Sequence, residues 1–472
     1  MTTTAHTDLR SPADLAGRRV LVLGLARSGI ASVRFLVTTG AEVTVYDRRS
    51  PEELADAVAR LEGLPIRFAL AIPPEELIRL LGDAELVVTS PSISPRFPTT
   101  DPWLRSALLQ AEARGVALLS EVDLFLRLTP SRVLAVTGTK GKTTTTSLVG
   151  AILAADGMPH LVGGNIGRPL LDHLDELGPD AWAVLELSEL QLPTISRGAD
   201  ISLYTNITAD HLDRHGTVEA YRAVKGRLAE LARGPVVLNA DDPGCRELAA
   251  RLPKLEIAWY GGDEGRAALR DGWIVLDGEP LIAAEELQLP GQHMLHDALG
   301  AALAARLAGV ASASIRAALR SFRGVPHRLE TIAERRGVRY VNDSQATIPL
   351  ATIAALQAFG RRRLVLIAGG QGKGLAYDEL ADAIVSHCAA VVLIGETADE
   401  LERLIAGRIR VRRAASMDTA VAEATALAES GDVVLLSPAA ASFDMFTDYA
   451  ARGDAFRAAV AAIPETSTEG EP

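Results

Sequence analysis

A segment rich in glycine, lysine and threonine has the residue types and spacing needed to hold phosphate groups. An apolar run ends at Val136 and leads into Thr137-Gly138-Thr139-Lys140-Gly141-Lys142-Thr143-Thr144, after which a helical pattern continues to Leu153. The two glycines let backbone N–H groups turn toward phosphate oxygens, and the following helix N-terminus favours an anion. Lys142 adds a positive charge and Thr143 a hydroxyl for magnesium. Val136 stands where the strict pattern G-x-x-x-x-G-K-[ST] needs glycine, so a turn that only caps a helix stays the alternative.

Two further apolar runs end in polar groups that could serve such a loop. Glu186 follows the run that begins at Ala183, and burying this carboxylate alone would be costly, so we expect a divalent cation beside it. The alternative is a glutamate at a strand end that faces solvent. The run 201–205 leads into Asn206–His215, which holds two histidines and two aspartates. Oxygen ligands favour magnesium, and the absence of H-E-x-x-H argues against a catalytic zinc.

The first apolar run of the chain imitates a dinucleotide-binding turn. Val20–Leu23 is followed by Gly24, Gly29 and a helical stretch, and a second run ends at Asp47. The fingerprint G-x-G-x-x-G is broken, because Ala26 stands where the second glycine would let the backbone touch a pyrophosphate. The turn therefore indicates either a nucleotide-diphosphate site or a purely structural connection.

The amino-acid composition of the chain excludes several classes of protein. The 472 residues carry a net charge of −12 and no long basic run, which argues against nucleic acid as a partner. Two cysteines cannot build a disulfide framework or a cysteine-based zinc site. The polar N-terminus lacks a signal-peptide core and no long apolar run follows, so we expect a cytoplasmic protein without membrane contact. We expect a monomer as well, although no motif specifies the oligomeric state.

Alternation of apolar runs with amphipathic helical segments predicts an α/β fold built on mostly parallel sheets. Strand–glycine–helix openings near Gly24, Gly138 and Gly370 indicate three domains, two of them Rossmann-like around a central phosphate-loop domain. Prolines and a polar stretch near Ser120, and the segment Gly324-Val325-Pro326, suggest the boundaries. We predict domains over residues 1–120, 121–324 and 325–472.

The order of these motifs resembles the Mur ligases of peptidoglycan synthesis over nearly the whole chain. The resemblance rests on Gly138–Thr144, 163–167, Glu186-Leu187-Ser188, Asn206–Arg214, Lys225, Pro326-His327-Arg328 and Asn342-Asp343-Ser344. Within the family it is strongest to members that add D-glutamate to UDP-N-acetylmuramoyl-L-alanine, given the turn at Gly24, the stretch 186–192 and the stretch 436–442. It implies an ADP-forming amide ligase that uses ATP and Mg²⁺.

The resemblance also implies roles for individual residues. The ATP groups would be Gly138, Thr139, Lys140, Gly141, Lys142, Thr143, Thr144, Arg328 and Asp343. The magnesium groups would be Thr143, Glu186, His211 and a carbamylated Lys225, with Lys142, His211 and Lys225 acting in catalysis. Locally, Tyr221–Arg227 is typical of an exposed helix, and only the resemblance gives Lys225 a function. The UDP-linked substrate would contact Ser28, Asp47, Arg48, Asn165 and Ser188, and the amino acid Thr347, Lys373, Ser442 and Phe443.

Departures from the family pattern leave alternatives open. Gln345 and Ile348 stand where lysine and asparagine are usual, so a cation expected near the amino-acid carboxylate is absent. Glu189 replaces a serine, Met294 and Asp297 replace asparagines near the nucleotide, and Tyr449 replaces phenylalanine. The alternatives are a ligase for another amino acid such as L-glutamate, a regulatory homologue without ligase activity, and a dinucleotide oxidoreductase.

Overall fold

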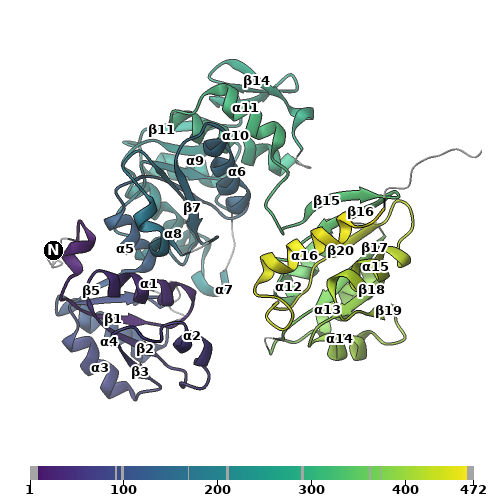
Figure 1. Cartoon of the computed structure of the whole chain (residues 1–472). Coiled ribbons are helices and arrows are strands. Elements are labelled where there is room, and N and C mark those ends of the chain that lie inside the picture. Colours follow the sequence, from purple (N-terminus) through teal and green to yellow (C-terminus); the bar gives the residue numbers. More distant parts are fainter. Residues whose placement is uncertain are drawn as a thin grey trace, which may run out of the picture. The chain divides into compact units, whose positions relative to one another are not determined.

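Three β-sheets, each with helices on both faces, make up the protein (Figure 1). The structure is a computed structural model that describes residues 9–90, 93–96, 100–167, 169–208, 212–288, 292–360, 363–372 and 374–464. Contacts within the chain divide it into two compact units, Met1–Phe322 and Arg323–Pro472. The predicted α/β class with three sheet-based domains is confirmed. The individual domain boundaries stay predictions.

The first sheet is parallel, with strand order β3-β2-β1-β4-β5. Its strands are β1 (Arg19–Leu23), β2 (Glu42–Asp47), β3 (Ile66–Leu70), β4 (Leu86–Thr89) and β5 (Ala117–Ser120). One face is covered by α1 (Arg27–Thr38), α2 (Ala55–Ala59) and α5 (Glu121–Leu128), the other by α3 (Pro74–Asp83) and α4 (Pro102–Ala113). Strand order reverses between β1 and β4, and in such sheets ligands bind at the carboxyl ends beside that point.

The second sheet has the strand order β14-β13-β12-β11-β10-β9-β6-β8-β7. Its strands are β6 (Arg132–Thr137), β7 (His160–Gly164), β8 (Trp182–Glu186), β9 (Ile201–Tyr204), β10 (Val236–Asn239), β11 (Ile257–Tyr260), β12 (Ala267–Arg270), β13 (Trp273–Leu276) and β14 (Glu279–Ala283). The pairs from β7 to β12 are parallel, and β13 and β14 form an antiparallel extension. Strand β6, which carries the predicted phosphate loop, therefore lies between β8 and β9.

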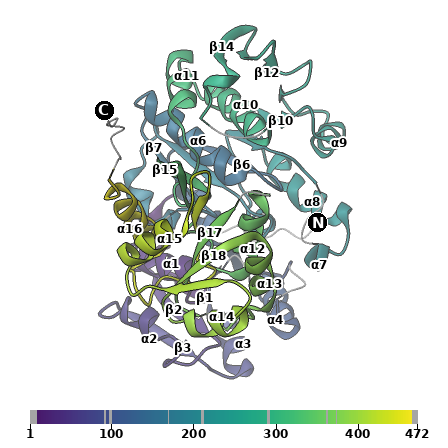
Figure 2. The same cartoon turned by 90° about the vertical axis from the view of Figure 1, so that its right-hand side faces the viewer.

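Helices α6 (Lys142–Ala155), α10 (Gln292–Leu307) and α11 (Ser312–Ser321) pack on one face of this sheet, with α6 beside α10 (Figure 2). The opposite face is covered by α8 (Val218–Glu230) and α9 (Pro243–Arg251). The short segments α7 (Leu212–His215), η2 (Leu170–Glu176), η3 (Leu192–Thr194) and η4 (Ala284–Glu286) connect these elements, and η1 (Pro12–Leu15) precedes the first sheet.

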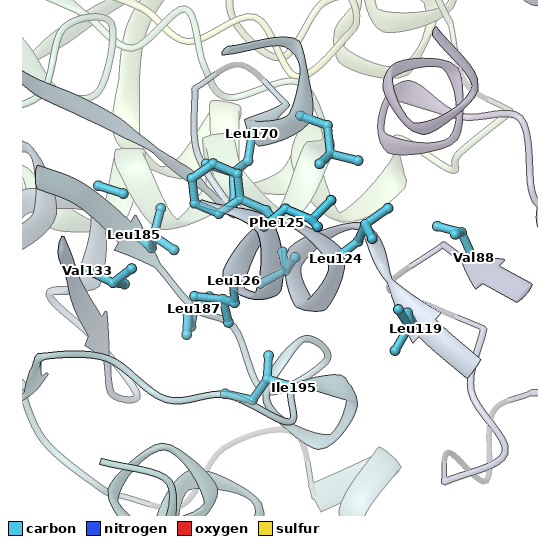
Figure 3. Packing of buried hydrophobic residues seen from close by; sticks show 14 of the residues in the cluster. Val88, Leu119, Leu124, Phe125, Leu126, Val133, Leu170, Leu185, Leu187 and Ile195 are labelled. Atoms are coloured by element: carbon cyan, nitrogen blue, oxygen red, sulfur yellow. The ribbon is translucent and has the colours of Figure 1, made fainter. Parts of the chain in front are cut away.

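A shared apolar core joins the first two sheets. Helix α5 contributes Leu124, Phe125 and Leu126, which lie between Val88 of the first sheet and Leu185 of the second (Figure 3). The same helix carries a buried carboxylate: Glu121 Oε1 accepts the N–H groups of Leu170 (2.8 Å) and Leu171 (3.2 Å) at the start of η2. The first two sheets thus form one compact unit.

The third sheet, in the second unit, has the order β15-β16-β20-β17-β18-β19. Its strands are β15 (Glu330–Arg335), β16 (Val338–Asn342), β17 (Leu364–Gly369), β18 (Cys388–Ile394), β19 (Arg410–Arg413) and β20 (Val433–Leu436), with β15 antiparallel to β16 and the other pairs parallel. One face carries α12 (Pro349–Ala358), α13 (Asp378–His387) and α14 (Ala398–Ile405), the other α15 (Met417–Leu427) and α16 (Tyr449–Ala461). In the described part of the chain, every helix is too short or too polar to cross a bilayer.

Candidate active site

The predicted phosphate loop connects strand β6 to helix α6. Gly138 and Gly141 both have positive φ angles, +147° and +84°, and Gly141 is the residue that caps α6. A side chain at Gly138 would overlap the hydroxyl of Thr205, and one at Gly141 would overlap the carboxylate of Asp297. Glycine is therefore required at both positions by backbone conformation and by space.

The end of strand β9 holds this loop in place. Thr139 N donates to Asn206 O (2.9 Å) and Lys140 N to Asn206 Oδ1 (3.0 Å), while Asn206 Nδ2 and Thr205 Oγ1 donate to Lys140 O (2.9 and 2.6 Å). The Lys142 ammonium donates to Thr139 O (2.9 Å), so it folds back over the loop. Thr143 and Thr144, in the first turn of α6, are half-buried. The loop therefore has an ordered backbone, with the Lys142 ammonium and the N-terminus of α6 beside it. Both features favour the binding of a phosphate group.

Lys225 reaches the same loop from helix α8. Its side chain is fully buried, and its ammonium donates to Gly138 O (2.8 Å) and lies 5.5 Å from the centre of the Tyr221 ring. The Tyr221 hydroxyl donates to Thr139 Oγ1 (3.1 Å). The prediction of an exposed helix is therefore wrong for the face of α8 that carries Tyr221 and Lys225. The spacing i, i+4 places Tyr221 and Lys225 on one side of a helix, and this signal could have revealed the missed role of Tyr221.

Glu186 ends strand β8 beside the loop and is only 2% exposed, so the solvent-facing alternative is wrong. Its Oε1 accepts from Asn165 Nδ2 (2.9 Å), and Asn165 N donates to Glu186 O (2.9 Å). Its Oε2 is buried without a hydrogen-bond partner among the described residues. A buried, unsatisfied carboxylate oxygen fits the predicted divalent cation, because cation binding would offset the cost of burial.

The rest of the predicted magnesium site is placed only in part. Three or more His, Cys, Asp or Glu side chains do not gather into a metal-binding group anywhere among the described residues, and His211 lies outside them. Ser188, nearly buried, has its N–H and hydroxyl directed to Gln191 Oε1 (3.0 and 3.1 Å). The unusual Glu189 accepts from Arg214 Nη1 (2.7 Å) and so ties the strand end to helix α7, a contact that the sequence motifs alone did not predict.

The turn at Gly24 in the first sheet is closed by the protein's own carboxylate. Asp47 Oδ2 accepts from Leu25 N (2.8 Å), and both carboxylate oxygens accept from the Arg49 guanidinium (3.0 and 2.9 Å). Burial alone would raise the pKa of Asp47, but these hydrogen bonds together hold it below its ordinary value. Ser28 is half-buried in the first turn of α1 and Arg48 is exposed at the end of β2. Their predicted contacts with a UDP group stay predictions.

In the second unit, Arg328 and Asp343 line one cavity of about 270 Å³ with Leu329 and Gln345. Asp343 is buried, accepts from Ser437 Oγ (2.8 Å) and Leu329 N (3.1 Å), and burial raises its pKa to about 6. Leu329 has a positive φ of +43°, a strained conformation for a leucine, and it brings that N–H to the carboxylate. The structure thus places Arg328 and Asp343 together.

The predicted amino-acid residues lie on loops that follow adjacent strands of the third sheet. Thr347, half-buried, follows β16, and Ser442, buried, follows β20 together with Phe443, which is 67% exposed. Lys373 lies outside the described residues. The fully buried Arg452 joins both loops, because its guanidinium donates to Ser344 Oγ, Ser344 O, Ala440 O and Ala441 O (2.9–3.1 Å). The sequence motifs did not point to Arg452, although an arginine within an alanine-rich helix was a signal.

Three family models match successive stretches of the chain: "Mur ligase MurD-like, N-terminal domain" over residues 18–116, "Mur ligase middle domain" over 136–305, and "Mur ligase, glutamate ligase domain" over 327–440. A relative from Solibacter usitatus is 42% identical over 450 residues, which are 94% of this chain and 97% of the relative. The chain belongs to the Mur ligase family. The resemblance inferred from its motifs is confirmed.

Other members of the Mur ligase family match over similar lengths. A relative from Caldanaerobacter subterraneus is 40% identical over 458 residues, 95% of this chain and 99% of its own length. Both relatives carry the name UDP-N-acetylmuramoylalanine--D-glutamate ligase. Among solved structures, UDP-N-acetylmuramate-alanine ligase from Thermotoga maritima matches with a TM-score of 0.52 and 19% identity, covering 93% of this chain and 98% of that one. That likeness supports the three-domain α/β fold.

Proposed function

We propose that this Mur ligase is an ATP-dependent amide ligase that joins D-glutamate to UDP-N-acetylmuramoyl-L-alanine and releases ADP and phosphate. The observation that carries the proposal is the identity of about 40%, over nearly the full length, to relatives with that name. The phosphate loop, with Lys142 and Lys225 on its carbonyl groups and Glu186 nearby, suits the chemistry. A cytoplasmic location follows from a reaction that uses ATP and a UDP-linked substrate.

Lys142 would act on the phosphate groups. Amide formation in water is uphill, so the alanine carboxylate must first become a better electrophile. Its oxygen attacks the γ-phosphorus of ATP, the bond to ADP breaks, and an acyl phosphate forms, while the Lys142 ammonium and the loop N–H groups offset the phosphoryl charge. The amine of D-glutamate then attacks the acyl carbon, loses a proton, and phosphate leaves.

Thr143, Glu186, His211 and carbamylated Lys225 are proposed to hold magnesium, which when bound neutralises phosphate charge. The unsatisfied Glu186 Oε2 supports this assignment. Carbamylation would turn the buried Lys225 ammonium into an anionic group beside the loop. A Lys225→Ala variant tests it: we expect activity to fall and to recover in part with added short-chain carboxylic acids, and no recovery would contradict the modification.

We assign the remaining predicted residues to contacts with the substrates. Ser28, Asp47 and Arg48 would contact the UDP group, Asn165 and Ser188 the muramoyl-alanine end, Arg328 and Asp343 the ATP, and Thr347, Lys373, Ser442 and Phe443 the incoming amino acid. Asn165 and Asp47 already have structural partners, so each would combine a positioning role with binding.

One measurement tests the proposal against its alternatives. Phosphate release from ATP is followed with UDP-N-acetylmuramoyl-L-alanine and a panel of D- and L-amino acids. We expect release with D-glutamate and none with L-glutamate. Release with another amino acid would identify that amino acid as the substrate in place of D-glutamate. No release with any of them would favour the alternative of a regulatory homologue without ligase activity.

A further inference from the structure

An ion pair connects the two segments that flank the strand of the phosphate loop. Glu189 follows β8, and its Oε1 accepts from Nη1 of Arg214 in α7 at 2.7 Å. Strands β8 and β9 lie on either side of β6 and run parallel to it, so the three carboxyl ends lie at one edge of the sheet. Helix α7 follows β9 along the chain. The pair therefore joins the segments beyond both neighbours of β6, at the edge where β6 leads into the phosphate loop.

On the β8 side, the ion pair restrains the segment that is predicted to meet the UDP-linked substrate. Leu187 N donates to Val136 O (2.8 Å), so backbone bonding between β8 and β6 continues to this residue. Ser188 follows, with its N–H and hydroxyl both donating to Gln191 Oε1. Glu189 is the next residue. The ion pair thus acts on the backbone directly after Ser188.

On the β9 side, the ion pair restrains a helix that is too short to hold its own position. Helix α7 has four residues, and a single turn gains little stability from its own hydrogen bonds. Its last residue, His215, places its ring edge-on to Tyr221, with the ring centres 5.4 Å apart. The Tyr221 hydroxyl donates to Thr139 Oγ1 of the phosphate loop (3.1 Å). Arg214 thus connects Glu189 to a series of contacts that ends at the loop.

Burial makes the loss of this ion pair costly. The Glu189 side chain is 10% exposed and that of Arg214 is 24% exposed. Removing either charge leaves the other partly buried without this partner. The cost falls when the remaining charge reaches water, so loss of the pair favours a displaced α7. A serine, which is usual in the family in place of Glu189, has no charge to pair with Arg214.

We propose that Glu189 is a positioning residue, which through Arg214 sets the separation between the Ser188 segment and the phosphate loop. The inference rests on the proposed function, because it assumes that the UDP-linked carboxylate and ATP meet at this edge of the sheet. The carboxylate oxygen must be held close to the γ-phosphorus and in line with it, and a displacement of about 1 Å can lower the rate on the order of 10²-fold. The proposed contacts of each substrate lie mostly outside the pair. Binding of the substrates therefore depends on the pair less than their reaction does.

A double-mutant cycle on kcat, measured by phosphate release, tests the proposal. We expect Glu189→Ser and Arg214→Ala each to lower kcat about 10-fold, and the double variant to be no slower than either, because the same pair is lost in all three. The KM for UDP-N-acetylmuramoyl-L-alanine and the dissociation constant of Mg·ATP, from calorimetric titration, should change less than about 3-fold.

The matched control is Arg233→Ala. It removes an ion pair with Asp200 (2.7 Å) at the opposite edge of the same sheet, where β9 and β10 begin. This variant should lower the unfolding temperature and leave kcat unchanged, which separates a loss of stability from a loss of positioning. Thermal unfolding shows that each variant is folded, and Arg214→Gln replaces Arg214→Ala in the cycle if the latter is not.

The outcomes separate this inference from the proposed function. An unchanged kcat in Glu189→Ser would overturn it, and so would a double variant whose loss is the product of the two single losses, because Glu189 and Arg214 would then act independently. A loss of Mg·ATP binding as large as the loss of kcat would indicate general disruption of the loop and would also overturn it. If the unaltered protein released no phosphate with any amino acid, the proposed function would fail and this inference with it. Normal turnover by the unaltered protein and by Glu189→Ser would overturn only the role of Glu189.

Discussion

The turns that follow β1 and β6 have the same local design, a buried parallel strand leading through glycine into a helix, but different charged side chains contact their backbone groups. After β1, the carboxylate of Asp47 accepts the N–H of Leu25 and is paired with Arg49. After β6, the loop carries the cations Lys142 and Lys225 on its own carbonyl groups. The N–H of Leu25 in the first turn is thus occupied by a carboxylate of the protein, whereas the second turn has the Lys142 ammonium folded over it and the Asp297 carboxylate beside Gly141.

This difference explains the broken dinucleotide fingerprint. In the intact fingerprint, backbone N–H groups of the turn are available to a pyrophosphate. Here Leu25 N–H is taken by Asp47, and Gly29 is needed because a Cβ there would overlap the carbonyl oxygen of Gly24. Glycine after a strand therefore does not by itself indicate a phosphate site. What distinguishes the two turns is which charged side chains the surrounding elements bring to them.

Removing the cation of the second turn should have the largest effect. We expect Lys142→Ala to lower kcat by about 10²–10³-fold or more, because charge developing on the phosphoryl oxygens would lose its closest compensation. Phosphate release measures the rate, and thermal unfolding should stay unchanged. Lys254→Ala, which removes an exposed lysine elsewhere, is the control. A near-normal rate in Lys142→Ala would show that the second turn does not need this cation to act on phosphate.

Neutralising the carboxylate beside the second turn should have the next largest effect. We expect Glu186→Gln to lower activity about 10–100-fold and to raise the magnesium concentration needed for half-maximal rate. Without magnesium the variant should be at least as stable as the unaltered protein, because a buried unsatisfied charge has been removed. Magnesium titrations of rate and of unfolding temperature test both parts, with the exposed Glu176 as the Glu→Gln control. An unaltered magnesium requirement would exclude Glu186 as a ligand.

The free energy of unfolding should depend on pH through Glu121, which lies in the core shared by the first and second sheets. Burial raises the pKa of Glu121 to about 7. Between its ordinary value near 4.5 and about 7, the folded state holds a proton that the unfolded state has released, so the free energy of unfolding falls as pH rises, by on the order of 2 kcal/mol. Glu121→Gln should flatten this dependence and Glu62→Gln should not. Denaturant unfolding from pH 5 to 8 measures it, and equal slopes in all three proteins would contradict the assignment.

Weakening the first turn should have the smallest effect. We expect Asp47→Asn to lower the free energy of unfolding by about 1 kcal/mol, because one charged acceptor for Leu25 and Arg49 is lost. The KM for the UDP-linked substrate should rise a few-fold while the dissociation constant of Mg·ATP stays constant. A change in ATP binding as large as the change in KM would show that the two turns are not independent.

Patterns within short segments predicted the fold and the loop well. Continuous apolar runs such as Val133–Val136 are buried on both faces, so their sequence signal is strong and β6 lies where it was expected. The phosphate loop followed from glycine spacing, since positive φ angles and close approach restrict Gly138 and Gly141 to glycine. Residues whose contacts lie far away in the sequence were harder to predict. Lys225 and Arg452 lie on helices with weak local patterns, and their burial depends on loops far away in the chain.

The sequence by itself determined the α/β class, the strand–loop–helix units and, through its motifs, membership of the Mur ligase family, because these depend on local periodicity and on residue types at fixed spacing. The tertiary structure decided how charge is arranged around the two turns. It placed Asp47 on Leu25 N–H, Lys225 on Gly138 O, and Asp297 against Gly141. These pairs are 22, 87 and 156 positions apart, and only the packing of strands and helices brings them within reach.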